Sequence, residues 1–191
     1  MLRTPFAQDD SSGTRRIDMK KQTKIAIYGG MFDPPTLGHL DVIKRASVLF
    51  DKMIVVELKN PEKEPMFDKE TRLKMLKAML SDMPEIEIYQ YDGLLTSFAH
   101  SVGANYSVRG VRNGFDADYE RPMFEFNSEI ARTEFENYSL DTIFIPTTRK
   151  NFDTSSSNIR ALIRGGAYKT ASKYLDSRVI EVIKAYKTHK N

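Results

Sequence analysis

Short apolar runs alternate with helical patterns from residue 24 almost to the end of the chain, and this alternation constrains the fold more than any other feature. Apolar runs typical of buried strands occur at residues 24–28, 53–58, 86–89, 106–108 and 140–145. Helical spacing or a capping residue predicts helices at residues 37–50, from Asp68 onward, and at 94–102, 116–136, 156–163 and 178–186. Strands that alternate with helices build βαβ units. We therefore expect an α/β fold in which helices cover both faces of a doubly wound, five-stranded and mostly parallel sheet.

The chain of 191 residues suits a single domain, which we place at residues 23–191. Residues 1–22 are polar and without periodicity, so we expect a disordered N-terminal extension or residues added upstream of the natural start. An arginine-bearing transit peptide is the alternative, but Asp9 and Asp10 argue against it.

Composition excludes several classes of protein. The chain has no cysteine, which excludes a disulfide scaffold, a thiol nucleophile and an iron–sulfur cluster. Most of the formal net charge of +3 lies in residues 1–22, so the domain offers no basic face and we expect no nucleic-acid partner. No apolar run reaches the ~18 residues that a membrane-spanning helix needs. We expect a soluble, cytoplasmic protein without a membrane partner.

One segment carries a specific chemical pattern, YGGMFDPPTLGH at residues 28–39. A strand runs into two glycines, then a turn stiffened by prolines, and then Thr-x-Gly-His at a helix start. Glycines let backbone N–H groups approach a phosphate closely, and a helix N-terminus carries about half a positive charge. His39 lies in the first helical turn, where its ring can donate to a phosphate oxygen. The simpler alternative is a strand–turn–helix corner with Thr36 as its cap and His39 on the surface.

With this segment the sequence resembles the nucleotidyltransferases whose signature is His/Thr-x-Gly-His, and among them the bacterial phosphopantetheine adenylyltransferases. The resemblance spans residues 24–187. Four segments carry it in the order of the family: YGGMFDPPTLGH, NPEKEPMF at 60–67, VRGVRNGFDADYE at 108–120 and TSSSNIR at 154–160. It implies a Rossmann-like fold and the transfer of AMP from ATP to 4'-phosphopantetheine, which yields dephospho-coenzyme A and pyrophosphate. It also implies a homohexamer built as a dimer of trimers.

The resemblance implies a role for individual residues. The catalytic residues are His39, Lys63 and Arg109. The substrate-binding residues are Met31, Lys63, Leu95 and Arg109. The ATP-binding residues are Met31, Phe32, His39, Gly110, Val111, Arg112, Glu120, Asn151, Phe152, Asp153, Thr154, Ser155, Ser156 and Ser157. Mg²⁺ is expected to arrive with the ATP phosphates, and no protein ligand is assigned to it.

Simpler explanations exist for several of these residues. Lys63 and Glu120 can be solvated charges, Arg109 and Arg112 can be surface arginines of a turn, and Leu95 can be a core residue. Ser155–Ser157 can cap a helix and bind a triphosphate at the same time.

The sequence departs from the family pattern at three places. Met31 stands where the family usually has Thr or Ser, and residues 151–154 replace an aromatic Trp-Ser-Phe-Ile stretch, which puts the adenine pocket in doubt. Pro122 lies inside the long predicted helix, where proline costs about 3 kcal/mol. We therefore expect this helix to start near Tyr119 or to kink at Pro122.

Two other functions fit parts of the sequence. A nicotinate-mononucleotide adenylyltransferase would suit the glycine turn and TSSSNIR equally well, whereas RGVRNGFDADYE favours phosphopantetheine as the acceptor. A nucleotide-binding sensor without turnover could keep the glycine turn, but it would have no reason to combine His39, Lys63 and Arg109.

Overall fold

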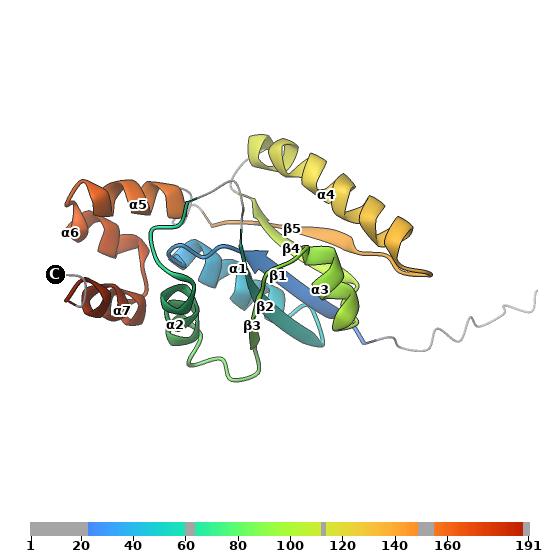
Figure 1. The fold of residues 1–191 in the computed structure, drawn as a ribbon, viewed down its shortest axis with the longest axis horizontal. Coiled ribbons are helices and arrows are strands. Elements are labelled where there is room, and N and C mark those ends of the chain that lie inside the picture. Colours follow the sequence, from blue (N-terminus) through green and yellow to red (C-terminus); the bar gives the residue numbers. More distant parts are fainter. Residues whose placement is uncertain (1–22, 60–63, 112–113, 149–154, 189–191) are drawn as a thin grey trace, which may run out of the picture.

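The computed structural model describes residues 23–59, 64–111, 114–148 and 155–188 (Figure 1). Five strands form one sheet in the order β3-β2-β1-β4-β5, and each neighbouring pair is parallel. The strands are β1 (Ile25–Gly30), β2 (Lys52–Leu58), β3 (Glu87–Tyr91), β4 (Tyr106–Val111) and β5 (Asp141–Pro146). The predicted five-stranded parallel sheet is confirmed. The expectation for residues 1–22 lies outside the described residues.

Helices cover both faces of the sheet, as the sequence predicts (Figure 1). They are α1 (Leu37–Ser47), α2 (Lys69–Met79), α3 (Leu95–Ser101), α4 (Gly114–Glu134), α5 (Ser156–Arg164), α6 (Tyr168–Ala171) and α7 (Ser177–Thr188), with a 3₁₀ turn at Ser172–Tyr174. Successive side chains of β1 point to opposite faces, so Ala26 and Tyr28 pack with α1, α2, α5 and α7, whereas Ile27 packs with α3 and α4. Two buried cores result, one on each face.

Side-chain caps fix the starts of three helices. Thr36 caps α1 by accepting the N–H of His39, Asp68 caps α2 by accepting the N–H of Thr71, and Ser155 caps α5 by accepting that of Asn158. Such a cap satisfies a backbone donor that the helix itself leaves without a partner. The predicted starts at residues 37, 68 and 156 therefore agree with the structure to within one residue.

Pro122 does not delimit α4. The helix begins at Gly114 and continues through Pro122, so the predicted start near Tyr119 is wrong. The alternative, a kink at Pro122, stays a prediction. Proline removes one backbone hydrogen bond and leaves one carbonyl without its helical donor. Pro122 itself is exposed, and the backbone is helical on both sides of it. The short helix α6 and the 3₁₀ turn were not predicted, since four- and three-residue elements carry no periodicity.

Candidate active site

The candidate site lies where the chain order of the sheet reverses. β1 pairs with β2 on one side and with β4 on the other, and in doubly wound sheets ligands bind at the carboxyl ends of strands at such a point. Gly29 and Gly30 end β1, while Arg109 and Gly110 lie near the end of β4. Nη1 of Arg109 donates to the carbonyl oxygen of Gly29 over 3.2 Å. Two segments that the sequence singles out are therefore joined at one edge of the sheet.

Two glycines pack closely against neighbouring side chains at this edge. A Cβ on Gly110 would lie 2.7 Å from Cγ2 of Val42 on α1, closer than carbon atoms can pack. A Cβ on Gly29 would lie 2.6 Å from Cδ1 of Leu95, at the start of α3. The helices α1 and α3 thus approach the strand ends closely from opposite faces. At both positions the absence of a Cβ lets the strand end and the neighbouring helix pack closely.

His39 is held by the residue that caps its own helix. The backbone N–H of Thr36 donates to Nδ1 of His39 over 2.9 Å, and the Thr36 side chain accepts the His39 N–H over 3.4 Å. Because a backbone N–H can only donate, this geometry assigns Nδ1 as the acceptor and places the ring proton on Nε2. The second ring nitrogen, Nε2, is therefore a hydrogen-bond donor.

Aromatic rings fix the imidazole from the side. The Phe32 ring meets His39 edge-on with centroids 5.1 Å apart, and the Tyr28 ring lies 6.2 Å from it. Phe32 has a φ of +47° and is 2% exposed. That φ lies in the left-handed region, which costs a bulky residue about 1 kcal/mol or more, and it turns the ring inward. Any contact of Phe32 with ATP must therefore come from its backbone.

The N-terminus of α5 docks against the proline turn. The Ser156 hydroxyl donates to the carbonyl of Pro34 over 2.9 Å, and Nη2 of Arg160 donates to Oγ of Ser157 over 3.0 Å. Ser155 is the N-cap. The structure thus brings the serine segment, more than a hundred residues away in sequence, to the turn that carries His39. Ser155 caps the helix as predicted, whereas Ser156 and Ser157 lie in its first turn and bond Pro34 and Arg160. Contact of these serines with a triphosphate stays a prediction.

The remaining predicted residues differ in where they lie. Met31 is half-buried directly after β1, and Val111 is buried at the end of β4. Leu95 is 7% exposed and packs in the core against Gly29. A core role accounts for it, and its contact with substrate stays a prediction. Lys63, Arg112, the side chain of Glu120 and residues Asn151–Thr154 lie outside the described residues.

Sequence reasoning missed three buried charged residues beside the site: Asp33, Glu57 and Arg72. Asp33 follows Phe32 in the motif and is 0% exposed, while Glu57 in β2 and Arg72 in α2 form a buried ion pair of 2.7 Å. The signal was present in part, since Asp33 sits in the turn that the glycines and prolines define. Arg72 had no signal, because a charged residue on a helix is normally exposed.

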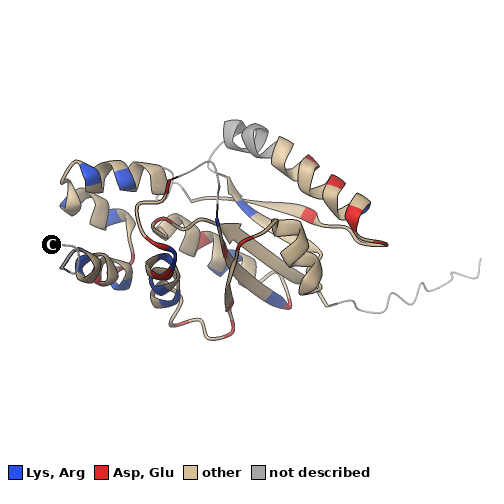
Figure 2. Ribbon diagram, viewed as in Figure 1, with Lys and Arg blue, Asp and Glu red and all other residues tan. Residues whose placement is uncertain are grey.

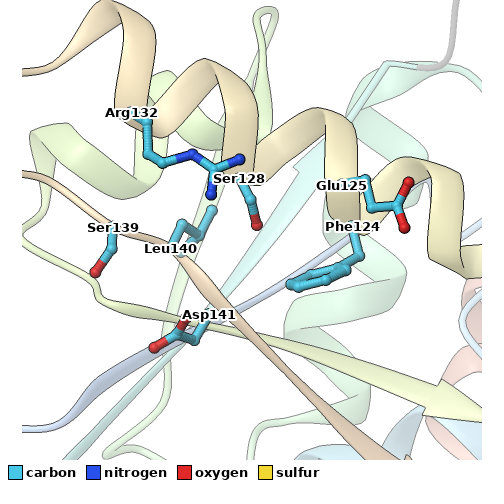
Figure 3. A pocket seen from close by; sticks show the side chains of 7 residues that line it. All are labelled: Phe124, Glu125, Ser128, Arg132, Ser139, Leu140 and Asp141. Atoms are coloured by element: carbon cyan, nitrogen blue, oxygen red, sulfur yellow. The ribbon is translucent and has the colours of Figure 1, made fainter.

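A cavity of about 280 Å³ lies elsewhere, between α4 and β5 (Figure 3). It is lined by Phe124, Glu125, Ser128, Arg132, Ser139, Leu140 and Asp141. Asp141 is the first residue of β5, so the cavity opens at the amino edge of the sheet. It is therefore not part of the candidate site at the carboxyl edge.

Cations gather near the serine segment. Helix α5 contains Arg160 and Arg164 and no acidic residue, and Figure 2 shows further Lys and Arg on the neighbouring helices α2 and α7. Acidic residues mark the exposed part of α4 instead (Figure 2). The N-terminus of a helix suits an anion such as a polyphosphate, while Arg160 lies mid-helix and Arg164 lies in the last turn of α5.

Comparison with known proteins agrees with this geometry. A family model described as cytidylyltransferase-like matches residues 27–162. The phosphopantetheine adenylyltransferase of Caldanaerobacter subterraneus subsp. tengcongensis is 40% identical over 143 residues, which are 75% of this chain and 86% of that protein. The enzyme of the same name from Lachnoclostridium phytofermentans is 35% identical over 160 residues, 84% of this chain and 93% of that one. The chain belongs to the phosphopantetheine adenylyltransferase family. It is thus a nucleotidyltransferase by descent.

A solved structure supports the fold. The nicotinic acid mononucleotide adenylyltransferase of Plasmodium falciparum, complexed with NaAD, superposes with a TM-score of 0.63 at 20% identity, over 86% of this chain and 96% of that one. At this identity the likeness shows the Rossmann-like nucleotidyltransferase fold and not the acceptor. Within the described residues, no helix is both long enough and apolar enough to cross a membrane.

Proposed function

We propose that this phosphopantetheine adenylyltransferase homologue transfers AMP from ATP to the phosphate of 4'-phosphopantetheine. A phosphate oxygen of the acceptor bonds to the α-phosphorus of ATP, the bond from that phosphorus to the bridging oxygen breaks, and pyrophosphate leaves. The product is dephospho-coenzyme A. The observation that carries the proposal is the junction of β1 and β4, where Arg109 bonds Gly29 at the edge that also carries the His39 turn.

For this reaction the protein must mainly position the two substrates and supply positive charge. The acceptor phosphate is already an anion near neutral pH, so no general base is needed. The protein must hold two polyanions in line and stabilise the negative charge of the transition state. The Nε2–H of His39 is directed by the Thr36 contact and donates to the α-phosphate. Arg109 binds the acceptor phosphate, because its planar fork matches phosphate oxygens.

Magnesium enters this proposal with the nucleotide. Among the residues that the structure describes, no three His, Asp or Glu side chains cluster to hold a metal ion. We expect the ATP phosphates themselves to coordinate the cation. When bound, Mg²⁺ neutralises part of the triphosphate charge, and the serine segment with the α5 N-terminus faces the remainder.

We also propose a homohexameric, cytoplasmic enzyme. Three apolar side chains of α4 and β5 support the assembly: Met123 is 48%, Phe126 56% and Phe144 37% exposed. Exposed large apolar groups mark candidate contact surfaces between proteins, and Met123 and Phe126 lie three residues apart on α4. Sedimentation equilibrium tests this point, and a mass equal to one 21.9 kDa chain would contradict it.

An omission experiment tests the reaction. Pyrophosphate release should require ATP, Mg²⁺ and phosphopantetheine together, and fall to background when any one is left out. Tight ATP binding without acceptor-dependent pyrophosphate release would instead indicate a nucleotide sensor.

A further inference from the structure

We propose that Asp33 is a positioning residue for the adenylyl transfer, and this inference rests on the proposed function. Its carboxylate ties the turn that carries Phe32 and His39 to the backbone of Met66 and Phe67. Asp33 is 0% exposed, yet it is an acidic side chain in a turn. A buried carboxylate persists only where donors replace the water that it has lost.

Those donors come from a segment 33 and 34 residues away. Oδ2 of Asp33 accepts the N–H of Met66 over 2.8 Å, and Oδ1 accepts the N–H of Phe67 over 3.0 Å. Each oxygen therefore serves one backbone donor. A neutral amide could not reproduce this arrangement, because it has a single acceptor oxygen and its NH₂ group would face the second N–H. The site selects a charged, two-oxygen acceptor.

The backbone carbonyl of Phe67 is also bound, by a residue of α2. Nη1 of Arg72 donates to the Phe67 carbonyl over 2.7 Å, and Arg72 is in turn paired with Glu57 in β2. The Phe67 ring is 2% exposed and meets Tyr186 of α7 edge-on. Buried charges from the β1–α1 turn and from α2 thus hold both polar groups of one residue. The backbone of Phe67 therefore cannot shift without leaving a buried charge unsatisfied.

A third segment is fastened to the same aspartate. Nη1 of Arg160 on α5 donates to the Asp33 backbone carbonyl over 2.8 Å and lies 3.7 Å from Oδ2. Asp33 therefore joins the His39 turn, the Met66–Phe67 segment and the N-terminal part of α5. These are three of the four motif segments that the sequence singles out. Transfer depends on the alignment of two substrates. Loss of the Asp33 contacts should therefore lower the rate more than it lowers ATP affinity.

The test compares Asp33→Asn with two controls at a temperature where all variants are folded. Asp51→Asn removes another carboxylate that accepts a backbone N–H, that of Lys24 over 2.9 Å, at the opposite edge of the sheet. Met79→Ala opens the core beside α7 and lowers the melting temperature without touching Asp33. Amide hydrogen exchange of a peptide covering residues 64–68 is measured together with kcat, KM and the dissociation constant of ATP.

We expect Asp33→Asn to raise exchange in residues 64–68 at least tenfold and to lower kcat ~10- to 100-fold, with ATP affinity changed less than about threefold. Both controls should keep wild-type exchange in this peptide and wild-type kcat. Unchanged exchange in Asp33→Asn would show that the Asp33 carboxylate does not hold the Met66–Phe67 backbone. Faster exchange with wild-type kcat would overturn the positioning role, as would an equal loss of kcat in Met79→Ala.

Failure of the proposed function looks different. A wild-type protein that releases no pyrophosphate with phosphopantetheine would contradict that function. In that case faster exchange in residues 64–68 of Asp33→Asn would still support the contact of Asp33 with the Met66–Phe67 backbone, and unchanged exchange would still refute that contact.

Discussion

The backbone N–H of Thr36 donates to Nδ1 of His39 over 2.9 Å. The residue that caps α1 thereby also sets the tautomer of the histidine in the first turn of that helix. Loss of the imidazole should leave the cap largely intact, since Thr36 Oγ1 still accepts the backbone N–H of residue 39. Catalysis and helix stability can therefore be separated at this position.

His39→Ala should lower kcat by ~10²-fold or more, because one preformed donor to a transition-state oxygen is lost. ATP affinity, measured by calorimetry, should change little. His100→Ala is the matched control. His100 lies on α3 rather than α1, and its ring stacks on that of Phe135 with centroids 4.1 Å apart. A rise in KM with an unchanged kcat would show that His39 binds only ground states.

Arg109→Ala should raise KM for phosphopantetheine ~10- to 100-fold, which corresponds to about 1.5–3 kcal/mol for a charge-assisted hydrogen bond. Arg109→Lys should recover only part of this loss, because an ammonium group cannot bind Gly29 and a phosphate with one planar fork. Steady-state kinetics with each substrate varied in turn provide the measurement. Equal losses for ATP and phosphopantetheine would place Arg109 on the nucleotide side.

Gly110→Ala should lower the free energy of unfolding by about 1–3 kcal/mol, since the new methyl group would overlap Val42. Adding Val42→Ala removes the atom that lies 2.7 Å away and should restore part of the stability. Urea unfolding of the single and double variants measures both effects. If the loss of unfolding free energy in the double variant equals the sum of the losses in the two single variants, the side chain of Val42 does not clash with the added methyl group.

Asp176→Asn tests a charge contact at the start of α7. Hydrogen bonds from the Arg178 guanidinium, followed by its backbone N–H, hold the pKa of Asp176 below its usual value. A lowered folded-state pKa means that the contact stabilises the fold above the unfolded pKa of about 3.9 and is lost as pH falls through the folded value. The variant should be about 1 kcal/mol less stable at pH 7, and this deficit should shrink as pH falls below about 3.9.

The control for this titration is Asp82→Asn, which also faces Arg178 but has an 81% exposed side chain. Its effect should stay below about 0.5 kcal/mol at every pH. A deficit in Asp176→Asn that is equal at pH 7 and pH 3 would mean that packing rather than charge is responsible.

Periodicity predicts the sheet and the long helices because β1 and β2 are buried on both faces and α1 buries one regular face. It cannot predict the buried charges. Arg72 lies on a helix whose other polar residues are more exposed, and only the tertiary partners Glu57 and Phe67 explain its burial. Pro122 shows the opposite error, since a local rule predicts a helix start that the flanking turns of α4 override.

The candidate site divides in the same way. His39, the glycines and the capping serines follow from a local motif, so the sequence indicates them. Asp33 belongs to the same motif, but its role depends on Met66, Phe67 and Arg160, whose positions are set by the tertiary fold.

The most direct measurement is the ratio of kcat/KM for phosphopantetheine to kcat/KM for nicotinate mononucleotide, with ATP and Mg²⁺ saturating and pyrophosphate as the readout. We expect phosphopantetheine to be favoured at least ~10³-fold, since acceptor choice reflects differential stabilisation of the transition state. The product should have the mass of dephospho-coenzyme A. A ratio below one would contradict the proposed acceptor, and the absence of pyrophosphate with either acceptor would contradict catalysis of adenylyl transfer to both.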